Sequence, residues 1–188
     1  MREIEVKQLT EEGFRKYGLY QNLLDDESLA QNAVFPRTFF ADVLGPLDFG
    51  NGNLPTVSVC QVEKKEEKRI DFIEFHEHTC EGILPLDGDV ILFVGTPGIY
   101  GLTPEHIEAF YVPRGTFVKM NPLIVHGNQF STSENTVHSM CLLAGRTFHN
   151  DMHVKQLSEE EKILMKGMVR IWEQKVTLRY LRTRMKSE

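Results

Sequence analysis

Short runs of apolar residues, broken by Gly, Pro, Asn and Asp, follow one another through the middle of the chain. The runs are rich in Val, Ile and Phe and include TVSVCQV, KRIDFIEF, DVILFVG, IEAFYVP, TFVKM and VHSMCLLAG. Short strands with turn residues at close intervals are typical of a β-sandwich or barrel, and no helical pattern between them indicates a parallel sheet. The pattern therefore predicts one mainly β domain over residues 1–157.

The amino-terminal segment predicts a strand followed by a short helix. REIEVKQL alternates between charged and apolar residues, as a half-buried strand does. TEEGFRKYG then has helical character, with Thr10 in the N-cap position and Gly18 at its end. Residues 25–55 follow as an irregular stretch, because GPLDFGNGNLP is rich in turn residues.

Residues 158–188 predict a single long amphipathic helix. Ser158 and Glu161 have the spacing of a capping box, and apolar residues then recur at helical intervals. These residues are Ile163, Leu164, Met168, Ile171, Trp172 and Val176. An apolar helix face of this length must be buried, so we expect it to pack on the barrel or on the partner in a homodimer. The basic residues from Lys175 to Lys186 would then form a solvated helix end.

Charge and composition exclude several classes of protein. The formal net charge of −6 disfavours a nucleic-acid partner, because phosphate binding depends on clustered Lys and Arg. No apolar run approaches the roughly 20 residues that cross a bilayer, and the amino terminus lacks the apolar centre of a secretory signal. We therefore expect a cytoplasmic protein with neither membrane nor nucleic acid among its partners.

The three cysteines are widely spaced and include no CxxC pair. An odd number of cysteines without regular spacing favours reduced thiols over a disulfide framework. Cys60 and Cys141 both lie in apolar runs, so we expect both to be core residues.

The segment RIDFIEFHEH carries the densest group of side chains that could bind a metal. Alternation along a strand places Glu74, His76 and His78 on one face. Two imidazoles two residues apart can reach one ion, and a carboxylate and a further imidazole from another strand complete a set typical of divalent metals. The competing interpretation of His78 is a solvated strand end. His138 shares its strand face with Met140 and favours a satisfied core histidine over a ligand.

Two spacings resemble the paired motifs of the cupin β-barrels. The spacing of the first motif, with Glu in place of its first His, is matched by Glu74, His76, Glu81 and Gly88. Gly115 to His126 resembles the second motif, with Pro122 displaced by one residue. The resemblance implies a cupin-like (RmlC-like) double-stranded β-helix, or jelly-roll barrel, and one divalent metal such as Zn, Mn, Ni or Fe. The candidate ligands are Glu74, His76, His78, Glu81 and His126.

A narrower resemblance, over about residues 3–146, is to the ureidoglycolate lyase family, formerly called hydrolases. The segments that carry it are VKQLTEEGFRKYG, HEHTCEGILPLDGDVILFV, IEAFYVPRGTFVKMNPLIVHGNQF and CLLAGR. In the last of these, Gly145 stands where the family has Asp. The resemblance implies a carbon–nitrogen lyase that splits a small ureido hydroxy-acid into glyoxylate and urea during the breakdown of purine-derived allantoin.

The same resemblance implies roles for individual side chains. His76, Glu81 and His126 would exchange protons with the substrate hydroxyl and with the departing ureido nitrogen. Arg146 and Arg37 would bind the substrate carboxylate, because a guanidinium can hold a carboxylate with two parallel hydrogen bonds. A divalent metal on the histidines and glutamates could instead polarise the substrate.

Three functions therefore stay open. The first is the lyase, and the second is a metal-dependent cupin of another reaction type, such as an isomerase or a dioxygenase. The third is a cupin that binds a small carboxylate-bearing metabolite without turnover. Fold-level analogy does not choose among them, because one fold supports many kinds of site.

Overall fold

The structure is a computed structural model that describes residues 1–31, 33, 45–50 and 53–167. Strands dominate it, and the helices of the described part are short. Among the described residues no helix has the length and apolar character to cross a membrane. The elements are β1 (Arg2–Gln8), α1 (Glu11–Phe14), β2 (Gly18–Asn22), α2 (Asp26–Gln31), β3 (Pro55–Val62), β4 (Arg69–Ile70), β5 (Phe72–Phe75), β6 (Glu81–Pro85), β7 (Val90–Val94), β8 (Glu108–Val112), β9 (Thr116–Met120), β10 (Phe130–Ser131), β11 (Val137–Ala144), α3 (Thr147–Asn150), β12 (His153–Gln156) and β13 (Ile163–Lys166).

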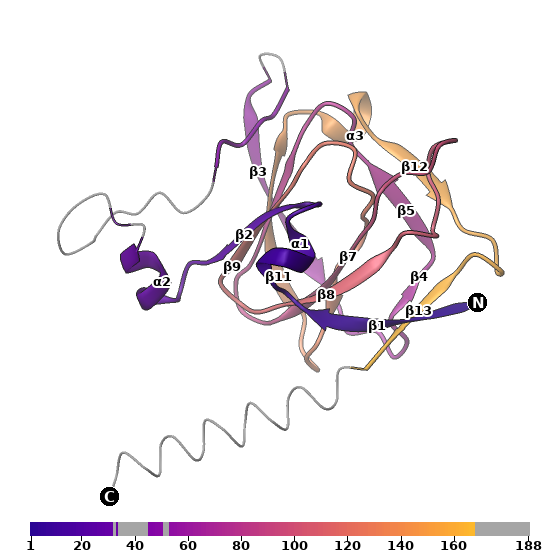
Figure 1. The fold of residues 1–188 in the computed structure, drawn as a ribbon, viewed down its shortest axis with the longest axis horizontal. Coiled ribbons are helices and arrows are strands. Elements are labelled where there is room, and N and C mark those ends of the chain that lie inside the picture. Colours follow the sequence, from indigo (N-terminus) through magenta and orange to yellow (C-terminus); the bar gives the residue numbers. More distant parts are fainter. Residues whose placement is uncertain (32, 34–44, 51–52, 168–188) are drawn as a thin grey trace, which may run out of the picture.

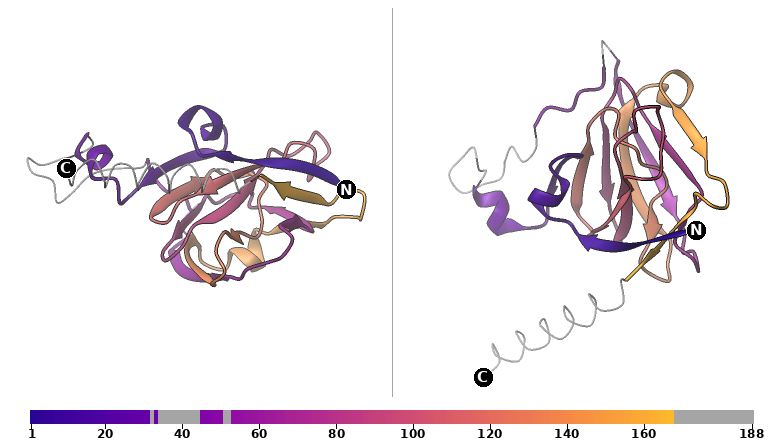
Figure 2. Two further views of the ribbon diagram at one scale, coloured as in Figure 1. Left: turned by 90° about the horizontal axis from the view of Figure 1, so that it is seen from below. Right: turned by 45° about the vertical axis from the view of Figure 1, so that its right-hand side comes forward.

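The strands form two main sheets that curl around a shared interior (Figures 1 and 2). One has the strand order β10-β7-β8-β1-β13-β4, and the other has the order β2-β9-β6-β11-β3. β12 and β5 form a separate short pair. The pairing is antiparallel except where β1 lies parallel to β8 and β13. This arrangement confirms the prediction of a mainly β domain.

The central strands β7 and β8 are almost entirely buried, which accounts for their nearly continuous apolar sequence. Val90, Leu92 and Val94 belong to a hydrophobic cluster that includes residues of β6, β9 and β11. Ile91 and Phe93 point the other way, into a second cluster with residues of β1, β4, β5 and β13. The core therefore has two layers, separated by β7 and β8.

The amino-terminal strand and helix are confirmed, but the helix is shorter than predicted. Thr10 Oγ1 accepts a hydrogen bond within the first turn and caps α1, which ends at Phe14. Gly18 opens β2 instead of ending the helix. Glycine is needed at this position, because a side chain would collide with Lys119 O on the neighbouring β9. The ring of Phe14 is fully buried against Phe110, so α1 covers part of the core. α2 also interrupts the stretch predicted to be irregular.

The helix predicted from Ser158 is wrong for the part of it that the structure describes. Glu161 accepts a hydrogen bond from Ser158 N, as a capping box would, but the chain turns there and then extends as β13. Ile163 and Met165 are buried in the second cluster, because pairing with β1 and β4 imposes a period of two. Tertiary contacts have overridden the local helix signal. The remaining apolar positions, from Met168 on, lie outside the described residues.

We predict that Ile163→Ala lowers the free energy of unfolding by about 2–4 kcal/mol, because it leaves a cavity beneath β13. Urea denaturation followed by circular dichroism measures this loss. Leu86→Ala is the matched control, since Leu86 is half exposed, and we expect a change below about 1 kcal/mol. Equal effects of the two substitutions would show that β13 does not belong to the core.

Candidate metal centre

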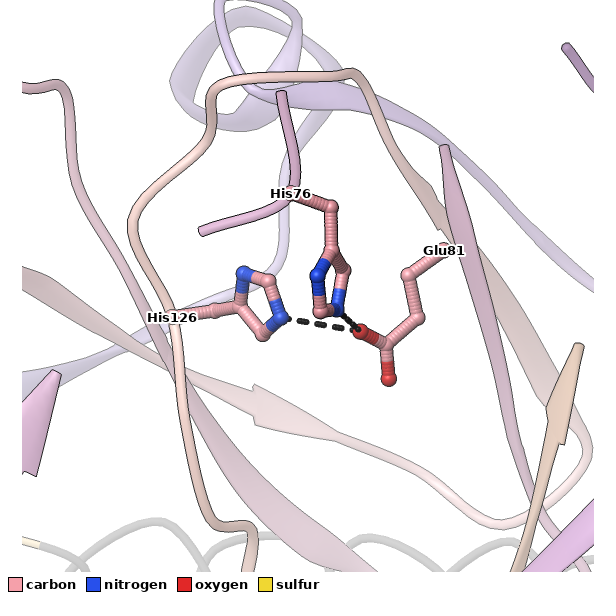
Figure 3. Close-up of side chains that lie close together, drawn as sticks. All are labelled: His76, Glu81 and His126. Atoms are coloured by element: carbon pink, nitrogen blue, oxygen red, sulfur yellow. Dashed lines mark ion pairs between the residues drawn. The ribbon is translucent and has the colours of Figure 1, made fainter. Parts of the chain in front are cut away.

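Three side chains from separate segments meet in the interior: His76, Glu81 and His126 (Figure 3). His76 directly follows β5, Glu81 opens β6, and His126 lies between β9 and β10. One ligand atom from each residue lies within 4.8 Å of the other two. Both imidazoles are buried, and the Glu81 side chain is only 13% exposed. The structure thus brings together three of the five predicted ligands.

Backbone pairing positions the two histidines. Glu74 and His126 form an isolated antiparallel bridge, in which each backbone N–H donates to the other residue's carbonyl, at 2.9 and 2.8 Å. One step further along, Leu123 N donates to His76 O at 2.7 Å. Glu81 reaches the same place from β6, where it pairs with Met120 of β9. The site is therefore held by strand pairing on each side.

The far nitrogen of each imidazole is hydrogen-bonded to a backbone carbonyl. His76 Nδ1 lies 2.8 Å from Asp151 O, and His126 Nδ1 lies 2.7 Å from Ile124 O. A carbonyl only accepts, so each Nδ1 must carry the proton. In the neutral ring Nε2 then has a free lone pair, which is the arrangement of a histidine ready to bind a metal.

The two Nε2 atoms face Glu81 without a well-directed hydrogen bond. The distances to Glu81 Oε2 are 3.3 Å from His76 and 2.8 Å from His126 (Figure 3). Both Nε2 atoms are nevertheless buried and lack a hydrogen-bond partner of acceptable geometry. A buried nitrogen in this state is costly unless a proton or a cation completes it. The arrangement therefore calls for positive charge between the three side chains.

The pKa shifts of Glu81 and His126 also favour a positive charge between the three side chains. Burial raises the pKa of Glu81, but the neighbouring imidazoles of His126 and His76 outweigh burial and lower it to about 2. Burial lowers the pKa of His126, and the Glu81 carboxylate outweighs burial and raises it to about 9. In the absence of a metal, the pair is therefore an ion pair, with the proton on His126.

Asp151 supports the site, although no motif in the sequence points to it. Its carboxylate accepts hydrogen bonds from Glu77 N and His78 N, at 2.8 and 2.9 Å. Its backbone carbonyl accepts from His76 Nδ1. The ring of Phe148 on α3 meets His76 edge-on, with ring centroids 6.4 Å apart. The end of α3 thus holds both the backbone after β5 and the orientation of the His76 ring.

The other two predicted ligands lie apart from the three that converge. Glu74 is buried on β5, and burial raises the pKa of its carboxyl group. It is close enough for His126, Glu81 and His76 to affect that pKa, but it does not join the group whose ligand atoms converge. The side chain of His78 is 73% exposed and lies 4.0 Å from Glu77. This exposure agrees with the interpretation of His78 as a residue at a solvated strand end.

The structure does not test the predicted role of Arg146 and Arg37 in binding the substrate carboxylate. Arg146 is exposed and has φ 66°, just before α3, and within the described part of the chain no ion pair holds its guanidinium. Arg37 lies outside the described residues.

His138 is hydrogen-bonded to Asp87, at 2.6 Å, but its side chain is half exposed, so the prediction of a core histidine is wrong. It stands on β11, where His138, Met140 and Leu142 share a face that is only partly buried.

The three converging residues fit a divalent metal. Two neutral imidazole nitrogens and one carboxylate are ligands that Zn, Mn, Fe and Ni accept. Both ring nitrogens that would bind are buried and face the Glu81 carboxylate, and a backbone carbonyl at Nδ1 orients each ring. A cation bound there would take the place of the proton on His126.

Comparison with known proteins gives distant matches among solved structures. No family model and no curated sequence matches the chain. Among solved structures, the oxalate decarboxylase of Bacillus subtilis, a protein with Mn(II) centres, is 12% identical with a TM-score of 0.39. That match covers 56% of this chain and spans 24% of the decarboxylase chain.

Two sugar-modifying enzymes also match. A sugar 3,4-ketoisomerase from Thermoanaerobacterium thermosaccharolyticum is 10% identical, with a TM-score of 0.35, and the match covers 66% of this chain and 74% of that one. A dTDP-4-dehydrorhamnose 3,5-epimerase from Elizabethkingia anophelis is 10% identical, with a TM-score of 0.33 and coverage of 58% and 53%. At TM-scores this low, the fold and the site rest on the chain's own strands and side chains.

We predict that the metal-free protein binds about one Zn²⁺ or Mn²⁺ per chain through the three converging residues. His126→Ala and Glu81→Gln should each weaken binding at least about 100-fold, because each removes a ligand. Isothermal titration calorimetry and elemental analysis measure affinity and stoichiometry. His138→Ala is the control, since its imidazole pairs with Asp87 outside the site. Unchanged binding in both site variants would contradict the assignment.

We also predict that Asp151→Ala weakens metal binding by about tenfold while leaving the stoichiometry unchanged. Removal of the carboxylate frees Glu77 N and His78 N, and the carbonyl that orients His76 is then less firmly held. Asp87→Ala is the matched control, because Asp87 makes the same kind of contacts with His138 N and Nδ1 away from the site. The idea fails if the two aspartate variants bind metal with the same affinity.

Proposed function

We propose that the protein is a metal-dependent enzyme of the cupin type that acts on a small carboxylate-bearing metabolite. One divalent transition metal would be held by His76, Glu81 and His126. The observation that carries this proposal is the convergence of two buried Nε2 atoms on the Glu81 carboxylate, at 3.3 and 2.8 Å.

A three-residue set favours catalysis over a structural role. Structural sites for such metals are usually closed by four protein ligands, whereas catalytic sites keep a position open for water or substrate. Two histidines and one carboxylate with open positions are also the set found in non-haem iron oxygenases. A dioxygenase is therefore the reaction class that the ligand set favours, with an isomerase as the other metal-dependent possibility.

The charge of the site favours an anionic substrate. Two neutral imidazoles and one carboxylate leave a bound divalent cation with a net positive charge of about one. A carboxylate from the substrate would complete that charge in a largely buried place, where electrostatic attraction is strong. Arg146, exposed at the start of α3, is the candidate for a second contact with the substrate anion. When bound, the metal would act as a Lewis acid on the substrate oxygen.

The chain's own groups prepare the site. Asp151 O and Ile124 O keep the Nδ1 proton on each ring and direct Nε2 inward. Glu81 supplies the negative charge, and its carboxylate is ionised at neutral pH, since its pKa is about 2. Burial of His76 and His126 excludes water from both rings.

A metal-free lyase of the ureidoglycolate type is the second candidate. The ion pair between Glu81 and His126 supports it, because a protonated imidazole beside a carboxylate can act as a general acid. In that case His126 would donate its proton to the departing ureido nitrogen, and Glu81 would keep the imidazolium in place. The third possibility, binding without turnover, has the same site and differs only in the absence of a reaction.

The experiment loads the reduced protein with Fe²⁺, Mn²⁺ or Zn²⁺ under nitrogen and then screens small hydroxy-, keto- and ureido-carboxylates in air-saturated buffer. Oxygen consumption detects a dioxygenase, solvent deuterium incorporation detects an isomerase, and urea release detects the lyase. We expect metal-dependent turnover that falls at least about 1,000-fold in Glu81→Gln and persists in His138→Ala. Urea release that is unaffected by a chelator would instead support the lyase. Tight carboxylate binding with no reaction under any metal would leave only a binding protein.

A further inference from the structure

Two cysteine thiols lie in contact on neighbouring strands, outside the candidate metal centre. Cys60 Sγ on β3 is 3.4 Å from Cys141 Sγ on β11. The strands are antiparallel, and their register pairs Cys60 with Ser139 and Ser58 with Cys141. The two cysteines are therefore diagonal neighbours on the same face of the sheet, although 81 residues separate them in sequence.

The two thiols differ in their access to solvent. Cys141 is buried in the first hydrophobic cluster, where it pairs with Ile83 of β6. Cys60 is exposed, so the prediction that it is a core residue is wrong. The physical reason is that β3 is the edge strand of its sheet and is exposed along nearly its whole length. A reagent in solution can therefore reach Cys60 while Cys141 stays packed in the core.

The contact also shifts the pKa values of the two thiols in opposite directions. The hydrogen bond with Cys141 lowers the pKa of Cys60 to about 7, so a large share of Cys60 is thiolate at neutral pH. The same hydrogen bond, followed by burial, raises the pKa of Cys141. Cys60 is thus the exposed nucleophile, and Cys141 is a protonated thiol held beside it.

We propose that Cys60 and Cys141 form a redox-active pair that closes to a disulfide when the protein meets a peroxide. The Cys60 thiolate attacks one oxygen of hydrogen peroxide, the O–O bond breaks, and with one proton the products are a sulfenic acid and water. The sulfur of Cys141 then attacks the Cys60 sulfur, its S–H proton leaves with the hydroxyl as a second water, and the S–S bond forms. Two thiols are oxidised as one peroxide is reduced to two waters, and a dithiol reductant reverses the change.

Closing the bond requires the backbone of β3 to move, because diagonal neighbours on paired strands lie about 7–8 Å apart and a disulfide usually joins Cα atoms about 4.4–6.8 Å apart. The sulfur atoms must approach from 3.4 Å to about 2.05 Å. In the described part of the sheet β3 pairs with β11 alone, so β3 can shift without breaking a second ladder. β11 also pairs with β6, the strand that Glu81 opens. The crosslink would therefore tie the exposed edge strand to the part of the sheet that carries the candidate metal centre.

The test treats the reduced protein with hydrogen peroxide at pH 7, alkylates the remaining thiols and maps them by mass spectrometry. We expect two of the three thiols to disappear, a crosslinked peptide that joins Cys60 to Cys141, and full recovery with dithiothreitol. The melting temperature of the oxidised protein should rise by about 5–10 °C, because the bond closes a long loop.

Cys80→Ala is the matched control and should keep the crosslink, since Cys80 is buried and burial raises its pKa. Cys60→Ser changes an exposed position and should abolish the crosslink without loss of fold. In Cys141→Ala, the sulfenic acid at Cys60 should persist and react with dimedone. The proposal is overturned if peroxide oxidises Cys60 while Cys141 remains a free thiol in the unaltered protein, or if neither thiol reacts.

Discussion

The backbone bridge between Glu74 and His126 is the interaction on which the candidate metal centre depends. It joins the end of β5 to the segment after β9, and so brings two imidazoles from distant parts of the chain to the first residue of β6. Core packing and strand pairing stabilise the bridge, because Ile73 of β5 is fully buried in the second hydrophobic cluster and β5 pairs with β12. The geometry of the site is thus a product of core packing.

Burial makes the charges in this site interdependent. Carbonyl groups accept hydrogen bonds from Nδ1 of both histidines, which leaves two inward-facing Nε2 atoms beside one carboxylate. Such a group is stable only with a proton or a cation between its members, so one scaffold can support either acid–base chemistry or a metal. The convergence of two buried nitrogens on Glu81, with three ligands among the described residues, is why the metal-dependent function is favoured here.

The resemblance to the paired cupin motifs grouped His76, Glu81 and His126, and the structure brings one ligand atom of each within 4.8 Å of the others. Asp151 had no such signal, because its contacts with the end of β5 cross 75 residues of sequence. The capping box at Ser158 was real but local, and burial of Ile163 and Met165 decided in favour of a strand. The exposure of Cys60 depends on which strand lies at the sheet edge, and strand order is not written in any local pattern.

The most direct test of the account is ¹⁵N NMR of the histidine side chains during titration of the metal-free protein with Zn²⁺. The structure predicts that His76 and His126 both carry a proton on Nδ1 throughout, and that the resonances of both Nε2 nitrogens shift with saturation at about one Zn²⁺ per chain. His138, which is paired with Asp87, should not respond. Protons on Nε2 alone in the metal-free protein, or Nε2 resonances that Zn²⁺ leaves unchanged, would contradict the central claim.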